Sequence, residues 1–130
     1  MAKILLVEDD PSINKVVSTK LQREGFEVII ASDGEEGFRR IKSDSPDLII
    51  LDIMLPKRDG FWVLEEMKID PEMKKYVPVI VLSNLGQPKD VDLAMKLGAK
   101  DYMIKTELSL AALIDKINSY LDTGAKKQEE

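Results

Sequence analysis

Residues 46–60 of the chain read PDLIILDIMLPKRDG, and this stretch decides the fold. Four apolar residues, Leu48 to Leu51, stand together without alternating with polar ones. That pattern is typical of a strand covered on both faces, as in a parallel sheet. An acid, Asp52, follows the run at once and is itself followed by apolar residues. A carboxylate in such surroundings is costly unless something compensates its charge, so Asp52 is the most informative residue of the chain.

Four other apolar runs share this pattern, and amphipathic stretches lie between them. The runs are 4–7, 28–30, 79–82 and 102–104. In the gaps, apolar residues recur at helical spacing, Gly25 lies where a first helix would end, and Asp33 with Glu36 has capping-box spacing. The alternation predicts a parallel sheet with right-handed crossovers and helices on both faces. We therefore expect one doubly wound α/β domain over 1–122 and a polar, disordered tail over 123–130.

Polar residues follow four of the five runs. Glu8 and Asp9 follow the first, Asp52 the third, Ser83 the fourth and Lys105 the fifth. If the runs are parallel strands, all five residues lie at one edge of the sheet, where open α/β folds bind their ligands. Neighbouring carboxylates repel one another, and a hard cation would relieve that repulsion. The pattern therefore indicates a divalent cation together with a phosphoryl group.

Asp52 has the chemistry of a nucleophile, because carboxylates form acyl phosphates. A backbone carbonyl just after it, that of Met54, offers a cation one more oxygen. Ser83 and Lys105 would hold the phosphoryl oxygens, since phosphoryl transfer depends on positioning and charge stabilisation. A purely structural ion pair between Lys105 and Asp52 stays open as an alternative.

The composition excludes several classes of site. The 130 residues include no cysteine and no histidine, which excludes thiol nucleophiles, cysteine zinc sites and histidine-dependent triads within the chain. The net charge is −5, from 19 basic and 24 acidic residues, which argues against direct binding to nucleic acid. The apolar runs are too short to insert into a membrane, and the first residues do not form a signal peptide. We expect a cytoplasmic protein.

Four segments together resemble the receiver domain of two-component response regulators, the CheY-like family. They are ILLVEDD at 4–10, PDLIILDIMLPKRDG at 46–60, PVIVLSN at 78–84 and LGAKDYMIK at 97–105. The similarity extends over about residues 2 to 122. It implies a flavodoxin-like, five-stranded parallel sheet in the order 2-1-3-4-5, which is the order of CheY itself, with five helices.

The resemblance also implies roles for the residues at the sheet edge. Asp52 is the phosphoacceptor. Mg²⁺, or Mn²⁺ in its place, is held by Glu8, Asp9, Asp52 and the Met54 backbone carbonyl, with Asp9 a more direct ligand than Glu8.

Three further residues complete the implied site and switch. Ser83 hydrogen-bonds the phosphoryl group, Lys105 pairs with it, and Tyr102 couples to Ser83 when the domain changes state. Many family members have proline after the lysine, whereas this chain has Thr106. Because a non-proline cis bond is costly, we expect the bond between Lys105 and Thr106 to be trans.

The function implied is a stand-alone phosphorylation-dependent switch. The phosphoryl donor is the phosphohistidine of a histidine kinase or a histidine phosphotransfer protein, and the output is contact with a downstream target protein. Such a protein is not an enzyme beyond catalysing its own phosphorylation and dephosphorylation.

Three alternative functions stay open. A receiver-like interaction module would never be phosphorylated. A small phosphohydrolase with an aspartyl nucleophile would follow the haloacid dehalogenase pattern, which expects a second acid where this chain has Met54. A flavin-binding protein of the same topology would need a phosphate-binding loop after the first strand, and none is evident.

Overall fold

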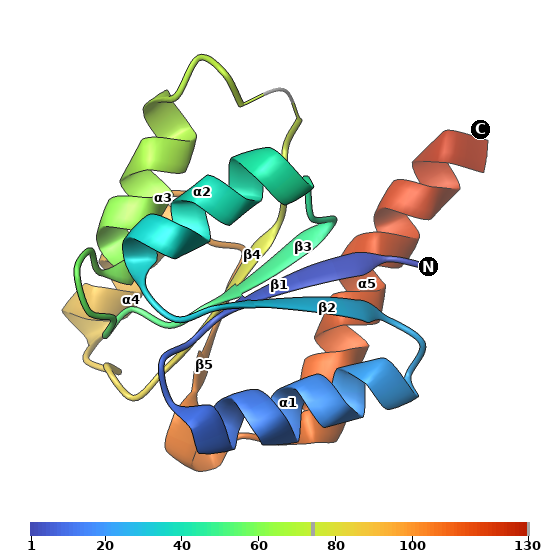
Figure 1. Ribbon diagram of the computed structural model, residues 1–130, viewed down its shortest axis with the longest axis horizontal. Helices are drawn as coiled ribbons and strands as arrows, with labels where there is room; N and C mark the ends of the chain where they lie inside the picture. The colour runs from blue at the N-terminus through green and yellow to red at the C-terminus, as the bar shows by residue number, and fades with distance from the viewer. Residues whose placement is uncertain (74, 130) are drawn as a thin grey trace.

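The computed structural model describes residues 1–73 and 75–129, with side chains as far as residue 121. Five parallel strands form one sheet in the order β2-β1-β3-β4-β5, which confirms the predicted topology (Figure 1). Each predicted apolar run lies within a strand. The strands are β1 (Lys3–Val7), β2 (Glu27–Ala31), β3 (Leu48–Leu51), β4 (Val79–Ser83) and β5 (Asp101–Ile104).

Among the described residues, four α-helices connect the strands, and a short 3₁₀ helix and a fifth α-helix follow β5. They are α1 (Pro11–Arg23), α2 (Gly34–Asp44), α3 (Gly60–Ile69), α4 (Pro88–Lys96), the 3₁₀ helix η1 (Lys105–Glu107) and α5 (Leu110–Glu129). The tail expected over 123–130 lies outside the residues whose side chains are described, so it stays a prediction. Within the part of the chain that the structure describes, no helix is both long and apolar enough to cross a bilayer.

Side-chain caps fix where α1 and α2 begin. The Asp10 carboxylate accepts a hydrogen bond from the Ser12 amide at 2.8 Å, and Pro11 occupies the first position of α1, where its missing N–H costs nothing. At α2, the Asp33 carboxylate accepts from the Glu36 amide at 2.8 Å, as predicted. The return bond differs from an ordinary capping box, because Glu36 accepts from the amide of Ser32, one residue before the cap.

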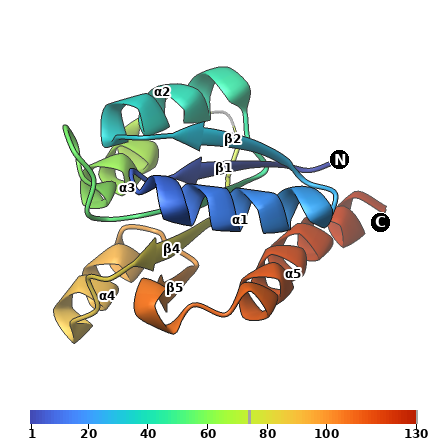
Figure 2. The same cartoon turned by 60° about the horizontal axis from the view of Figure 1, so that its bottom comes forward.

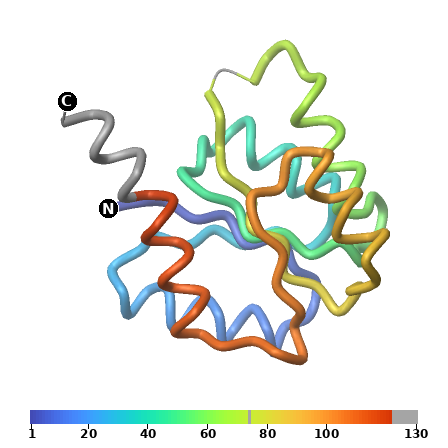
Figure 3. Tube along the Cα trace, turned by 180° about the vertical axis from the view of Figure 1, so that it is seen from behind, coloured from blue at the N-terminus to red at the C-terminus, as the bar shows by residue number. Residues whose placement is uncertain are grey.

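Both faces of the sheet are buried, which explains why its central strands read as continuous apolar runs. On β1, Leu5 and Val7 pack with the helices α2, α3 and α4, whereas Ile4 and Leu6 pack with α1 and α5. Figure 2 shows α1 and α5 on the opposite side of the sheet from α2 and α3. From behind, α5 runs past α1, which it contacts (Figure 3).

An aromatic contact joins α2 to α3. The rings of Phe38 and Trp62 meet edge to face, with their centroids 5.7 Å apart. The Arg58 guanidinium lies 5.2 Å from the centre of the Trp62 ring. Trp62 is partly buried against the α2, α3 and α4 side of the core, so its first role is packing.

Candidate functional site

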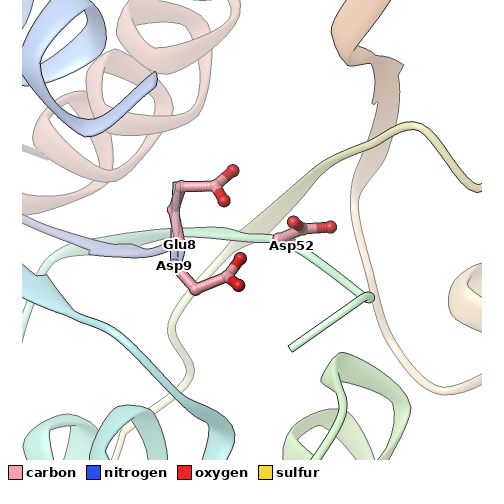
Figure 4. Close-up of side chains that lie close together, drawn as sticks. All are labelled: Glu8, Asp9 and Asp52. Atoms are coloured by element: carbon pink, nitrogen blue, oxygen red, sulfur yellow. The ribbon is translucent and has the colours of Figure 1, made fainter. Parts of the chain in front are cut away.

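The strand register brings three acids together at the carboxyl edge of the sheet. Val7 of β1 is paired with Leu51 of β3, so the acids that follow these two residues lie side by side. The carboxylates of Glu8, Asp9 and Asp52 each place an oxygen within 4.8 Å of the others. Figure 4 shows the three carboxylates gathered beyond the strand ends. Oxygen ligands in such a group suit a hard divalent cation, so the donor set fits the predicted metal.

Asp52 is only 3 % exposed, and three hydrogen bonds hold it in place. Its backbone N–H donates to the Val7 carbonyl at 3.0 Å. Its carboxylate accepts from the Met54 backbone N–H at 3.1 Å on one oxygen and from the Lys105 ammonium at 2.7 Å on the other. The carboxylate is thereby fixed in one orientation at the rim of the core.

Lys105 bridges two buried acids. Its Nζ lies 2.6 Å from a Glu8 oxygen and 2.7 Å from an Asp52 oxygen, and its own side chain is only 12 % exposed. Burial acts to lower the pKa of Lys105, but its hydrogen bonds to Asp52 and Glu8 outweigh burial and raise that pKa above its usual value. The lysine is therefore fully charged at neutral pH and compensates part of the acidic charge.

Glu8 and Asp9 differ in their surroundings. Glu8 is 1 % exposed, and burial raises the pKa of its carboxyl group. Both Glu8 oxygens are engaged, one by Lys105 and the other by the Asp10 backbone N–H at 3.0 Å. Asp9 is exposed to solvent. This difference supports the expectation that Asp9 contacts a cation more directly than Glu8 does.

Ser83 and Tyr102 are linked through one loop residue. Ser83 is fully buried and forms the last residue of β4, rather than following the strand as its position after the apolar run indicated. Its hydroxyl accepts from the Leu85 backbone N–H at 3.2 Å, and the Tyr102 hydroxyl donates to the Leu85 carbonyl. Burial raises the pKa of Tyr102, with a further contribution from the charge of Asp90. Leu85 therefore connects the two predicted switch residues.

Sequence reasoning missed three contributors to this site. The Asn84 side chain accepts from the Thr106 backbone N–H at 3.1 Å and so ties the loop after β4 to η1. The Asn14 side chain donates to the Glu8 carbonyl at 2.9 Å. Gly60 packs on the peptide of Asp52. No local pattern marks such contacts, because each joins residues from different elements.

Two of the predicted details concern the backbone beside the site. No peptide bond among the described residues is cis, so the bond between Lys105 and Thr106 is trans, as expected. The Met54 amide contacts Asp52, and the Met54 side chain is 59 % exposed. The proposed role of the Met54 carbonyl as a metal ligand stays a prediction.

Comparison with known proteins gives a consistent result. The family model of the response regulator receiver domain matches residues 4–118. The chain is 43 % identical over 103 residues to a probable transcriptional regulator, ycf27, of Guillardia theta, and 42 % identical over 103 residues to the alkaline phosphatase synthesis transcriptional regulatory protein PhoP of Bacillus subtilis. Each match covers 79 % of this chain but only 39 % and 42 % of those relatives, respectively.

Solved structures agree over nearly the full chain. A CheY-like receiver domain protein of Methanospirillum hungatei has a TM-score of 0.87 at 29 % identity, with 98 % of each chain covered. A receiver domain of the Francisella response regulator 1452 has a TM-score of 0.84 at 31 % identity, with 95 % of this chain and 99 % of that chain covered. The resemblance read from the sequence is confirmed: this chain belongs to the response regulator receiver domain family of two-component systems.

Proposed function

We propose that this chain is a phosphorylation-dependent switch in which Asp52 accepts a phosphoryl group from a partner's phosphohistidine. Membership in the receiver family is consistent with that function. The observation that carries the proposal is the buried bridge of Lys105 between Glu8 and Asp52, inside a group of three carboxylates. Phosphoryl transfer to a carboxylate needs positive charge beside it to stabilise the phosphoryl oxygens. Lys105 and a cation bound by the three carboxylates would supply that charge next to Asp52.

In the proposed reaction, a carboxylate oxygen of Asp52 attacks the phosphorus atom of the phosphohistidine. An oxygen–phosphorus bond forms, the phosphorus–nitrogen bond breaks, and its electron pair stays on the donor's imidazole. Lys105 pairs with the phosphoryl oxygens, and the buried Ser83 hydroxyl donates a hydrogen bond to one of them. Asp9, Asp52, the Met54 carbonyl and, less directly, Glu8 would hold a Mg²⁺ or Mn²⁺ ion, which would supply charge neutralisation for these oxygens.

The proposed output is a change in the protein-binding surface. In the structure, the Ser83 hydroxyl accepts a hydrogen bond from the Leu85 backbone N–H, and the Leu85 carbonyl accepts one from the Tyr102 hydroxyl. When the Ser83 hydroxyl turns to the phosphoryl group, its hydrogen bond with Leu85 breaks. The loop after β4 and the ring of Tyr102 are thus coupled to the state of Asp52. This is the kind of two-position element through which phosphorylation acts.

The proposed partners are a histidine kinase or histidine phosphotransfer protein as donor and a downstream target protein as receiver of the signal, in the cytoplasm. One relative, RpaA of Synechocystis, is named a DNA-binding dual master transcriptional regulator, and this chain matches 43 % of its length. For this chain, with its net charge of −5, we propose no direct contact with nucleic acid. We also propose no turnover of a separate substrate.

The test uses acetyl phosphate as a small phosphodonor. The chain is incubated with acetyl phosphate and Mg²⁺, and its intact mass is measured. We expect one added phosphoryl group, which is absent in Asp52→Asn and absent without a divalent cation. Asp92→Asn, which changes an exposed acid on α4, serves as the matched control and should keep the adduct.

The other outcomes identify the alternatives. If no adduct forms and beryllofluoride does not bind under any condition, the chain is an interaction module that is not phosphorylated. If assorted phosphate esters are turned over rapidly, the chain is a phosphohydrolase.

A further inference from the structure

Gly60, the first residue of α3, lies directly against the backbone of the proposed phosphoacceptor. A Cβ atom built on Gly60 would lie 2.5 Å from the Asp52 carbonyl oxygen and 2.7 Å from the Ile53 Cα. Real Cβ atoms essentially never approach another heavy atom closer than 3.0 Å. Both contacts are with main-chain atoms, so no change of a side-chain rotamer relieves them.

The same peptide segment is fixed by hydrogen bonds from two sides. The Asp52 N–H donates to the Val7 carbonyl of β1 at 3.0 Å. The Ile53 carbonyl accepts from the Gly60 N–H at 2.9 Å and from the Leu55 N–H at 3.0 Å. The backbone at Asp52 is thus held between the end of β1 and the start of α3, and Gly60 closes the loop that contains Met54.

We propose that Gly60 is a positioning residue for phosphoryl transfer: its missing side chain lets α3 start against the Asp52 peptide and so sets where the Asp52 carboxylate and the Met54 carbonyl lie. This inference rests on the function proposed above. It assigns to the start of α3 a role beyond packing, because the atoms that a Cβ would displace belong to the phosphoacceptor and its neighbour.

Another glycine, which packs against the same loop from α2, offers a matched control. A Cβ on Gly34, at the start of α2, would overlap the Arg58 carbonyl and side chain. That contact lies at the far end of the loop from Asp52 and involves no atom of the phosphoacceptor. Gly34→Ala therefore disturbs the same loop without acting on the Asp52 peptide directly.

A second control separates positioning from stability. Leu64 lies on α3, is 2 % exposed and belongs to the core beneath that helix. Leu64→Ala leaves an unfilled space in the core and destabilises the protein, but it adds no atom near Asp52. It therefore reports what loss of stability alone does to the site.

The experiment compares the wild-type chain with Gly60→Ala, Gly34→Ala and Leu64→Ala. Mg²⁺ affinity is measured by titration calorimetry, and the phosphorylation rate constant is measured at saturating Mg²⁺ and acetyl phosphate. If the added methyl group displaces the Asp52 carboxylate by nearly 1 Å, we expect Gly60→Ala to lower that rate constant about 100-fold, because a misplacement of this size slows a reaction by about that factor. We also expect its Mg²⁺ affinity to fall, whereas both controls stay within about threefold of the wild type in both measurements.

The proposal is wrong if Gly60→Ala retains wild-type rate and Mg²⁺ affinity, or if the controls lose as much as it does. If Gly60→Ala is unfolded in buffer, all variants are compared in trimethylamine N-oxide, which favours compact states. If Gly60→Ala folds in that solution and is phosphorylated at the wild-type rate, the proposal is likewise wrong. A wild-type chain that neither binds Mg²⁺ nor becomes phosphorylated would instead refute the proposed function itself.

Discussion

The two ends of the sheet carry the same kinds of charged residue in opposite surroundings. At the carboxyl end, Lys105 lies 2.6 Å and 2.7 Å from acids that are 1 % and 3 % exposed. At the amino end, Lys75 lies 3.5 Å from Asp47, and both side chains are about half exposed at 51 % and 42 %. Residue type is therefore not what distinguishes the two ends; burial is.

This difference determines what each set of charges contributes. An exposed ion pair is screened by water and contributes about 0–1 kcal/mol to stability. A buried pair costs energy to desolvate, and removing one partner leaves an uncompensated charge. The carboxyl end thus holds a set of charges that a cation or an anionic group perturbs strongly, whereas the pair of Lys75 and Asp47 at the amino end behaves as an ordinary solvated ion pair.

The largest expected effect comes from removing the lysine at each end. Lys105→Met leaves Glu8 and Asp52 buried without a cation, and we expect the free energy of unfolding to fall by roughly 3–5 kcal/mol at neutral pH without divalent ions. Lys75→Met should cost less than about 1 kcal/mol. Urea unfolding followed by circular dichroism measures both. Equal, small losses would show that the two ends do not differ in this way.

Mg²⁺ should distinguish the two ends of the sheet further, through its effect on the stability of variants at each end. A ligand that binds only the folded state stabilises it by RT ln(1 + [L]/Kd), which is about 1.4 kcal/mol at tenfold the dissociation constant. We expect that gain for the wild type, and for Asp70→Asn at the amino end, but not for Asp9→Asn. Thermal unfolding with and without MgCl₂, at constant ionic strength set by NaCl, makes the measurement. A gain that survives in Asp9→Asn would place the cation elsewhere.

The smallest expected effect is a pH dependence at the amino end. A hydrogen bond from the Glu72 amide, together with Lys42, holds the pKa of Asp70 below its usual 3.8. A carboxyl group with a lowered pKa adds stability above its unfolded-state pKa, and that stability is lost as pH falls through the folded-state pKa.

Asp70→Asn should therefore melt slightly below the wild type at pH 7, and the gap should close below pH 3.8. Melting temperatures across this range test the sign. A gap that widens on acidification would mean that Asp70 is destabilising as a carboxylate.

The fold was predictable because its signals are local. Continuous apolar runs mark strands buried on both faces, and Asp10, Asp33 and Gly25 mark helix ends. Local signals leave the order of the strands open, because they say nothing of which strands are neighbours. That order came from the resemblance of four separated segments to one family, and the sheet confirmed it.

The site was predictable only as a meeting of residues at one edge. Side chains after parallel strands share that edge, which brings Glu8, Asp9, Asp52 and Lys105 together. The distances among them depend on strand register, such as the pairing of Val7 with Leu51, which packing sets. For the same reason the sequence did not reveal that Lys105 contacts two acids at once. The roles assigned to these residues in phosphoryl transfer stay predictions.

The contact between Trp62 and Phe38 gives this protein an optical probe of its own. Trp62 is the one tryptophan of the chain, and the guanidinium of Arg58, from the loop that follows Asp52, lies 5.2 Å from the centre of its ring. Indole emission responds to a nearby cation and to packing against another ring. Intrinsic fluorescence therefore reports on that loop, and chemistry at Asp52 that moves the loop can be followed in real time without an attached dye.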